Sequence, residues 1–465
     1  MKTVSLSMTE GHFDVLNNFL FPGDGKEAAA ILLCGRSVGG RCHRLLVREI
    51  HFVPYASCTI RAADQLKWPT DAIVDYLDKA EENGWSVVKI HSHPNGYPKF
   101  SGIDDISDRE LLPSIKSWVE KDIPHGSVIM LPDGKMVGRV MDKEGAFVPM
   151  LWVNVVGEDL RFWYTDEVGK KENSFAASHA QVLGRGTMEM LKRLSVAVIG
   201  CSGTGSPVIE QLFRLGVGEL VLVDDDKVEE RNVNRIVNSK MSDAGAYKVD
   251  VLAAAIEITG IGTEVRVVKK NLWDPEAIKE VAQCDIVFGC VDSLDGRFIL
   301  NAIATNYIQA YFDLGVRIDT YRTAERKGEI REVCGTVHYL QPGQSSLMSR
   351  GLFSIDQANA AALARLDPIA HAEQVKDGYI AGVDEQQPAV IMLNMNIATW
   401  AINEMLSRLH PYRQGPNGEF ASVTISLTGM DIITEPESAY KRCTYLSTDV
   451  GLGDRIPLLG LPQLS

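Results

Sequence analysis

Two histidines and two carboxylates in the first third of the chain have the types and spacing of a hydrolytic metal site. A β-branched run predicts a strand over Val87–His93, and the period of two along a strand points the imidazoles of His91 and His93 to the same face. Asp104 follows in the first turn of a helix predicted to begin near Ser101, so its carboxylate can return to the same metal. Two imidazoles and one carboxylate leave a fourth tetrahedral position for water, which is the arrangement of a catalytic zinc.

A metal-bound water needs a general base, and Glu27, in the segment KEAAAILLCG, is the candidate. The alternative for these residues is structural. An H-x-H pair on a strand is often two half-buried histidines, and an isolated Glu27 would be a solvated carboxylate. The joint occurrence of all the elements at fitting spacing favours the zinc site.

A second set of residues surrounds the glycine-rich turn GCSGTGS. The apolar run Val196–Ile199 before it predicts a central parallel strand, and an amphipathic helix is predicted from Ser206. Gly200, Gly203 and Gly205 would leave backbone amides bare for a phosphate at the helix N-terminus. Serine replaces the middle glycine of the G-x-G-x-x-G pattern, so the loop alone also fits a purely structural turn.

The residues after this turn favour nucleotide chemistry. The next predicted strand, Leu220–Val223, delivers Asp224 at its carboxyl end, where an acid can bind ribose hydroxyls. Further polar residues follow at Asp225, Asp226, Asn232, Asn234, Arg235, Lys248 and Asp292. A dehydrogenase does not need these cations and a late acid, whereas an enzyme that holds a triphosphate with magnesium uses both.

The glycine turn, the segment VDDDKVEERNVNR and the later DSLDGR resemble the ubiquitin-activating superfamily of ThiF-like adenylating enzymes, over the chain from about residue 181 onward. The resemblance implies attack of a protein's C-terminal glycine carboxylate on the α-phosphate of ATP, which gives an acyl-adenylate and pyrophosphate. Positive charge near the phosphates, including that of Arg235, would stabilise the transition state. The implied contacts are Asp224 at the ribose, Asn232 and Arg235 at the phosphates, Lys248 at the triphosphate, and Asp292 at magnesium, and Asp226 is a further nucleotide-binding residue.

The distant glutamate, H-x-H-P and S-x-x-D resemble the JAMM (JAB) zinc metalloproteases, isopeptidases that cut ubiquitin-like proteins. This resemblance implies His91, His93 and Asp104 as zinc ligands and Glu27 as the base that activates water. Ser101 would donate to the tetrahedral oxyanion. Every element of the pattern is present.

Composition bounds the functions that remain. The formal net charge of -14 argues against nucleic acid as the main partner, because binding phosphodiesters needs a basic face. No apolar run reaches the length of a membrane span, and the first residues lack a signal-peptide core. The eight cysteines form no C-x-x-C pair, which favours a reducing cytoplasm and argues against a cysteine-built zinc site.

Strands that alternate with helices predict an α/β protein of two domains. We expect a JAB/MPN-like zinc isopeptidase domain over residues 1–164, a polar linker over 165–178, and a Rossmann-like adenylating domain with a mostly parallel sheet over 179–465. The resemblance also implies a homodimer. A single helix is expected at His179–Arg193 and another at Ala389–Leu409, which follows the alanine-rich run Ala360–Val375.

The sequence does not decide which group accepts the activated acyl group. Cys443 lies in the polar segment YKRCTYLS and is a candidate nucleophile, with an ordinary loop cysteine as the alternative. We expect a bifunctional enzyme that processes and activates a ubiquitin-like protein with Zn²⁺, ATP and Mg²⁺, working with a ubiquitin-conjugating-like enzyme. The alternatives are activation of a sulfur-carrier protein for cofactor or metabolite synthesis, and a binding scaffold without turnover.

Overall fold

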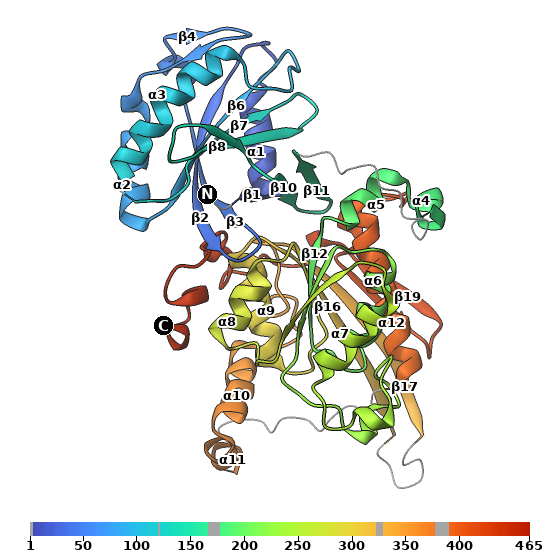
Figure 1. Ribbon diagram of the computed structural model, residues 1–465. Coiled ribbons are helices and arrows are strands. Elements are labelled where there is room, and N and C mark those ends of the chain that lie inside the picture. Colours follow the sequence, from blue (N-terminus) through green and yellow to red (C-terminus); the bar gives the residue numbers. More distant parts are fainter. Residues whose placement is uncertain (1–2, 120, 166–176, 322–328, 377–389) are drawn as a thin grey trace. The chain divides into compact units, whose positions relative to one another are not determined.

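The chain forms two compact units in the computed structural model, which describes residues 3–119, 121–165, 177–321, 329–376 and 390–465 (Figure 1). One unit comprises Met1–Gly169, Asn306–Ile308 and Asp449–Ser465, and the other comprises Lys170–Thr305 and Gln309–Thr448. Nearly all of the predicted linker 165–178 lies outside the described residues. Within the described ranges no helix has the length and apolar character needed to cross a bilayer.

A nine-stranded sheet in the order β11-β10-β1-β3-β2-β6-β7-β8-β9 forms the centre of the first unit. It is mixed: β1 runs parallel to β3 and β10, β6 runs parallel to β7, and the remaining pairs are antiparallel. Its strands are β1 Val4–Thr9, β2 Ala29–Val38, β3 His43–Phe52, β6 Ser86–Ser92, β7 Gly126–Met130, β8 Met136–Met141, β9 Phe147–Pro149, β10 Trp152–Val156 and β11 Leu160–Tyr164. A separate hairpin pairs β4 Ile60–Arg61 with β5 Leu66–Lys67.

Helices cover both faces of this sheet (Figure 1). Along β2, Ala30 and Leu32 pack in one core with α1, while Ile31 and Leu33 pack in a second core with α2 and α3. This alternation is the period of two expected of a strand that is buried on both faces. The helices are α1 Glu10–Leu20, α2 Val74–Asn83 and α3 Gly102–Val119.

The late segment Asp449–Ser465 belongs to the first unit, although the sequence predicted an adenylating domain that runs to residue 465. Gly453 forms a parallel β-bridge with Arg36 near the end of β2. Asp454 donates its N–H to the Arg36 carbonyl at 2.7 Å and accepts the Val38 N–H at 2.7 Å. The segment therefore pairs with a stretch of β2 that β6 leaves free, because β6 pairs only with Ala29–Cys34.

An eight-stranded sheet in the order β14-β13-β12-β15-β16-β17-β18-β19 forms the second unit. Its first five strands are parallel to one another, as the sequence predicts, and the last three are added antiparallel. The strands are β12 Ser195–Ile199, β13 Glu219–Val223, β14 Glu264–Val268, β15 Ile286–Gly289, β16 Ala310–Thr320, β17 Ile330–Leu340, β18 Ser422–Ser426 and β19 Asp431–Glu435.

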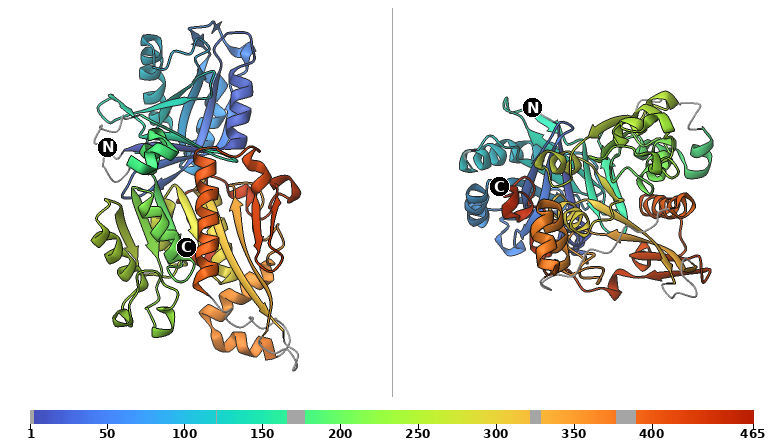
Figure 2. Two further views of the ribbon diagram at one scale, coloured as in Figure 1. Left: turned by 90° about the vertical axis from the view of Figure 1, so that its right-hand side faces the viewer. Right: turned by 90° about the horizontal axis from the view of Figure 1, so that it is seen from below.

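The helices of the second unit lie on both faces of its sheet, and the orange-red helix α12 runs beside the sheet in Figure 2. They are α4 Ala177–Leu183, α5 Arg185–Leu191, α6 Gly205–Arg214, α7 Lys248–Thr259, α8 Pro275–Ala282, α9 Leu294–Asn306, α10 Ile355–Leu366, α11 Pro368–Lys376 and α12 Ile391–Leu409. The helix predicted at His179–Arg193 is split, and the alanine-rich run holds parts of two helices. Gly184, with φ of 82°, separates α4 from α5, and Pro368 begins α11 after α10 has ended.

The pairing of the late segment with β2 can be tested by adding a methyl group where the two backbones touch. A Cβ on Gly35 would lie 1.9 Å from the Gly451 carbonyl oxygen, so Gly35→Ala should displace the segment. We expect a loss of about 1–3 kcal/mol in the free energy of unfolding, the usual cost of overpacking, and faster proteolysis within residues 449–465. Gly40→Ala is the matched control, because nothing lies within 4 Å of its added atom. Equal behaviour of the two variants would contradict the pairing.

Candidate functional site

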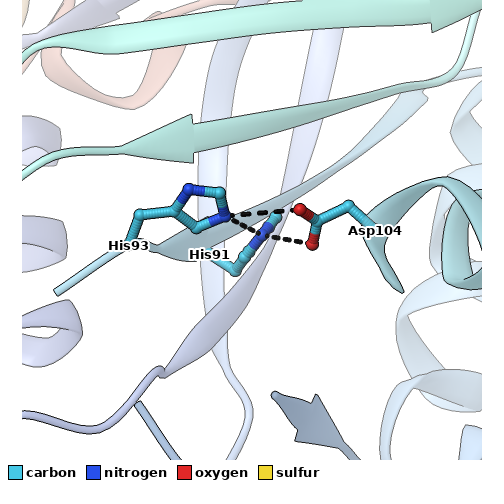
Figure 3. Close-up of side chains that lie close together, drawn as sticks. All are labelled: His91, His93 and Asp104. Carbon is cyan, nitrogen blue, oxygen red and sulfur yellow. Dashed lines mark hydrogen bonds and ion pairs between the residues drawn. The ribbon is translucent and has the colours of Figure 1, made fainter. Parts of the chain in front are cut away.

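His91, His93 and Asp104 form a buried cluster of three possible metal ligands in the first unit (Figure 3). The Nε2 atoms of the two histidines are 3.1 Å apart. The Asp104 carboxylate lies 2.9 Å from His91 Nε2 and 3.4 Å from His93 Nε2. One ligand atom from each residue falls within 4.8 Å of the others, so all three can reach one ion, and their chemistry is that of zinc ligands.

Local structure fixes the direction of each side chain. The β6 strand ends at Ser92, and the His93 N–H continues the pairing to the Met130 carbonyl at 2.9 Å. His93 Nδ1–H donates to the Tyr97 carbonyl at 2.8 Å, which leaves the Nε2 lone pair for a metal. Ser101, directly before α3, donates its N–H and its hydroxyl to Asp104 Oδ2 at 2.6 and 2.7 Å. Ser101 therefore holds the carboxylate in the arrangement seen here.

The electrostatics of the cluster favour a cation. Complete burial lowers the pKa of His91 to about 4, so its imidazole is neutral at pH 7. Burial also opposes protonation of His93, but its contacts with Asp104 and the Tyr97 carbonyl outweigh this effect and raise its pKa. Burial would raise the pKa of Asp104, yet hydrogen bonds from both histidines lower it strongly. An anionic carboxylate thus faces two imidazoles that can be neutral.

Glu27 lies beside this cluster, because the backbone of the adjacent residue is tied to the strand that carries the histidines. The Ala28 N–H donates to Ser92 Oγ at 3.0 Å, and the Ser92 N–H donates to the Ala28 carbonyl at 3.0 Å. Glu27 is 6% exposed, and its pKa is raised to about 7, mainly by burial. The negative charge of Asp104 adds to this rise, while the charge of His93 opposes it. A carboxylate with this pKa can accept and return a proton near neutral pH.

The glycine turn of the second unit leaves no room for side chains. Gly200 has a φ of 87°, which L side chains rarely adopt. A Cβ on Gly205 would lie 1.9 Å from the Gly200 carbonyl oxygen. On Gly203 it would lie 2.5 Å from Asn394 Nδ2 and 3.2 Å from Arg235 Cδ. Gly205 is therefore required by close packing and Gly200 by its backbone conformation, whereas Gly203 leaves space that the Asn394 side chain fills, and the three lie at the N-terminus of α6.

Acids and a lysine meet at the carboxyl end of β13. Asp224 accepts the Cys201 N–H at 2.7 Å and the Asp226 N–H at 2.9 Å, so it touches the glycine turn directly. Lys248 Nζ lies 2.7 Å from Asp226 and 3.6 Å from Asp224. Burial raises the pKa of Asp224, and the charge of Lys248 opposes this rise. The lysine is available to a phosphate if it leaves these carboxylates.

The structure places the remaining predicted residues around the same edge. Asn232 is buried at the end of a 3₁₀ turn and accepts the Glu229 N–H at 3.1 Å. The Arg235 guanidinium donates to the Arg231 carbonyl at 2.9 Å, while its stem lies against Gly203. Asp292 is exposed in the segment that follows β15, the strand next to β12.

One residue of this edge carried no signal in the sequence. Asn394, in the first turn of α12, is fully buried, and its Oδ1 accepts the Thr204 hydroxyl at 3.3 Å. Its Nδ2 lies against Gly203 without a hydrogen-bond partner among the described residues. The chain separation of 190 residues from Thr204 explains why periodicity and motif spacing did not find it.

Cys443 is buried in the second unit, with 4% of its surface exposed, and its N–H donates to the Gln344 carbonyl at 3.0 Å. The sequence placed it in an open polar loop. The neighbouring Arg442 donates to the Gly343 carbonyl at 2.7 Å. Burial raises the pKa of the Cys201, Cys290 and Cys334 thiols of this unit.

Comparison with protein families identifies both parts of the chain. Residues 176–434, more than half of the sequence, match the family model of the ThiF family. The chain belongs to the ThiF family. Residues 9–156 match the model described as prokaryotic homologs of the JAB domain. The glycine turn and its acids thus lie in the ThiF domain, and the histidine cluster lies in the JAB domain.

Known proteins are similar to part of the chain. The ubiquitin-like modifier-activating enzyme 5 of Bombyx mori is 28% identical over 169 residues, which cover 34% of this chain and 40% of that enzyme. The enzyme of the same name from Aedes aegypti is 26% identical over 220 residues, with coverages of 44% and 52%. The chain thus spans about half or less of the length of these relatives.

Solved structures are also similar to the chain. E. coli MccB, solved with ATP, has 18% sequence identity and a TM-score of 0.44, and the match covers 60% of this chain and 76% of MccB. PaaA has 17% identity and a TM-score of 0.42, with coverages of 59% and 88%.

Zinc affinity of the JAB domain should depend on pH. The metal must displace the proton of His93, whose pKa lies above its usual 6.5. We expect the apparent affinity to be constant above this pKa and to fall as the pH is lowered through it. Competition with a chromogenic zinc chelator over a pH series measures the change. An affinity that stays constant from pH 8 to about pH 5.5 would contradict the proposed ligand set, because imidazole ligands titrate in this range.

Close packing at the glycine turn of the ThiF domain predicts the effect of one methyl group. Gly205→Ala places a Cβ against the Gly200 carbonyl, so we expect ATP binding to weaken at least about tenfold as the backbone amides lose their alignment. Gly186→Ala is the control, because its added atom meets nothing within 4 Å. Titration calorimetry with ATP compares the two variants. If Gly205→Ala binds ATP with the affinity of the wild type, the turn does not contribute to the nucleotide site.

Proposed function

We propose that the protein processes and activates a ubiquitin-like protein. In this proposal the JAB domain hydrolyses a peptide or isopeptide bond after the terminal glycine, and the ThiF domain adenylates the freed carboxylate with ATP. Membership of the ThiF family supports the second activity, since relatives of the chain are named as ubiquitin-like modifier-activating enzymes. The buried cluster His91, His93 and Asp104 beside Glu27 is the observation that supports the first.

Hydrolysis would use five residues of the JAB domain. His91, His93 and Asp104 would hold Zn²⁺, which supplies a water of lowered pKa when it is bound. Glu27 would take the proton of that water and pass it to the leaving amine, which its pKa of about 7 suits. Ser101, whose hydroxyl donates to Asp104 in this structure, would turn its hydroxyl toward the oxyanion.

Adenylation would occur at the carboxyl edge of the ThiF sheet. Asp224 would bind the ribose, with Asp226 near it, and the amides of the glycine turn would bind phosphate at the start of α6. Arg235 and Lys248, now engaged by a backbone carbonyl and by two carboxylates, would turn to the phosphates. Asp292 would hold Mg²⁺. The glycine carboxylate attacks the α-phosphorus and pyrophosphate leaves, so the acyl-adenylate and pyrophosphate account for all atoms.

A sulfur-carrier pathway is the second candidate, and the burial of Cys443 favours it. A thiol that accepts an acyl group must be reachable by the adenylate, and the reactive form is the thiolate. Activation of a sulfur carrier can stop at the adenylate, where an external sulfur nucleophile displaces AMP. We propose for the conjugation pathway a ubiquitin-conjugating-like partner that takes the acyl group, and for either pathway a homodimer in the cytoplasm.

Fusion of the two domains fits this scheme because one tail is the substrate of both. A small protein held near the chain after cleavage meets the second site at a higher effective concentration than a freely diffusing one. This advantage requires only a shared substrate. The scheme therefore needs no direct channel between the two sites.

Separate loss of the two activities tests the proposal. Glu27→Gln should lower hydrolysis of a glycine-ended small protein with a C-terminal extension by about a hundredfold or more, the usual contribution of a general base, and should leave ATP–pyrophosphate exchange unchanged. Asp292→Asn should abolish exchange and leave hydrolysis unchanged. Each variant is the control for the other. If neither activity occurs in the wild-type protein with candidate small proteins, a non-catalytic scaffold replaces the proposal.

A further inference from the structure

Arg139, on β8 of the JAB domain, is a buried cation that the proposed reaction does not use. Its guanidinium carbon lies 3.8 Å from the ring centre of Phe100 and 3.7 Å from that of Phe147. The side chain is 8% exposed, so the two rings and the protein interior replace most of its water. An arginine held in this way has one preferred orientation, because its planar group can stack and form directed hydrogen bonds at the same time.

The same guanidinium ties the first turns of α3 to the sheet. Arg139 donates through Nε and Nη2 to Asp108 Oδ2 at 3.1 and 2.7 Å, and through Nη1 to Asp105 Oδ1 at 2.5 Å. Asp108 is completely buried and also pairs with Lys89 of β6. Two cations and two carboxylates thus form a balanced cluster, in which each buried charge has a partner.

Two routes lead from this cluster to the proposed metal ligands. Asp105 directly follows Asp104 on α3, so the ion pair of Asp105 with Arg139 limits movement of the carboxylate ligand. Phe100, stacked on Arg139, also lies beside His91, with ring centres 6.5 Å apart. One side chain on β8 therefore supports ligands that come from two other elements, the strand β6 and the helix α3.

We propose that Arg139 is a positioning residue of the metal centre: it sets the geometry of Asp104 through Asp105 and that of His91 through Phe100. This inference rests on the proposed zinc site. Groups that orient ligands from outside the coordination sphere usually affect metal affinity about tenfold to a hundredfold. Arg139 would act in this way without touching the metal, the substrate or the reacting atoms.

Arg139→Lys tests the proposal because it keeps the charge while it removes the planar fork and the stacking. The matched control is Arg161→Lys, in the same unit. Arg161 also joins a carboxylate, Glu10, at 2.8 Å and lies over an aromatic ring, that of Phe13 at 4.8 Å. Each full-length protein is titrated with Zn²⁺ against a chromogenic chelator and with Co²⁺, whose visible absorption reports coordination geometry. Thermal unfolding of the metal-free proteins is measured alongside.

We expect Arg139→Lys to bind Zn²⁺ about tenfold or more weakly and to shift the Co²⁺ absorption bands, and Arg161→Lys to bind within about twofold of the wild type. Wild-type affinity and spectrum in a folded Arg139→Lys protein would overturn the proposal, even if its melting temperature falls, because the role of Arg139 would then be confined to stability. If Arg139→Lys does not fold, Asp105→Asn replaces it, since Asp105 is partly exposed and its loss breaks only the link to Asp104. For that variant too, the Zn²⁺ affinity and the Co²⁺ absorption spectrum decide whether the proposal holds. Absence of Zn²⁺ binding by the wild-type protein would instead remove the zinc site on which the inference rests.

Discussion

Two hydrogen bonds between Ala28 and Ser92 set the arrangement of Glu27 and the histidine cluster in the JAB domain. They join β2 to β6 at the point where one strand begins and the other ends. As a result Glu27 lies beside the two histidines that flank Ser92, although 64 positions separate Ala28 from Ser92 along the chain. Burial of this junction keeps His91 neutral and gives Glu27 a pKa near neutrality. The strand pairing therefore sets both the positions and the protonation states of the reactive groups.

The ThiF domain depends on a different constraint, which is close backbone approach. The Gly200 carbonyl would lie 1.9 Å from a side-chain atom on Gly205, so the turn folds back on itself as it enters α6. This compact turn places the Cys201 N–H on Asp224 and so couples the ends of β12 and β13. Because these strands and β15 are parallel neighbours, polar residues that follow each of them gather at one edge of the sheet.

Much of the fold and of both sites could be predicted from the sequence, because the signals were local. The spacing of His91, His93 and Asp104 follows from the period of a strand and from the first turn of a helix, and the structure brings the three together. The alternation of strands and helices predicted an α/β fold, and the parallel half of the second sheet confirms it.

Features that depend on contacts distant in sequence were missed. Asn394 reaches the glycine turn from α12, and Arg139 reaches the histidine cluster through Phe100, yet neither belongs to a motif. The single helix predicted at His179–Arg193 was wrong because Gly184 adopts a positive φ and ends α4. Cys443 lies in a segment of polar composition, but its side chain is buried by tertiary packing that composition does not report.

The pairing of Gly453 and Asp454 with the end of β2 bears on how the protein is made. Synthesis proceeds from the amino terminus, and domains usually fold as they emerge from the ribosome. Here the unit that is synthesised first also includes Asp449–Ser465, so it stays incomplete until translation has passed the whole ThiF domain. A prematurely terminated chain would lack this segment. Completion of the unit that holds the JAB domain is therefore coupled to production of the ThiF domain.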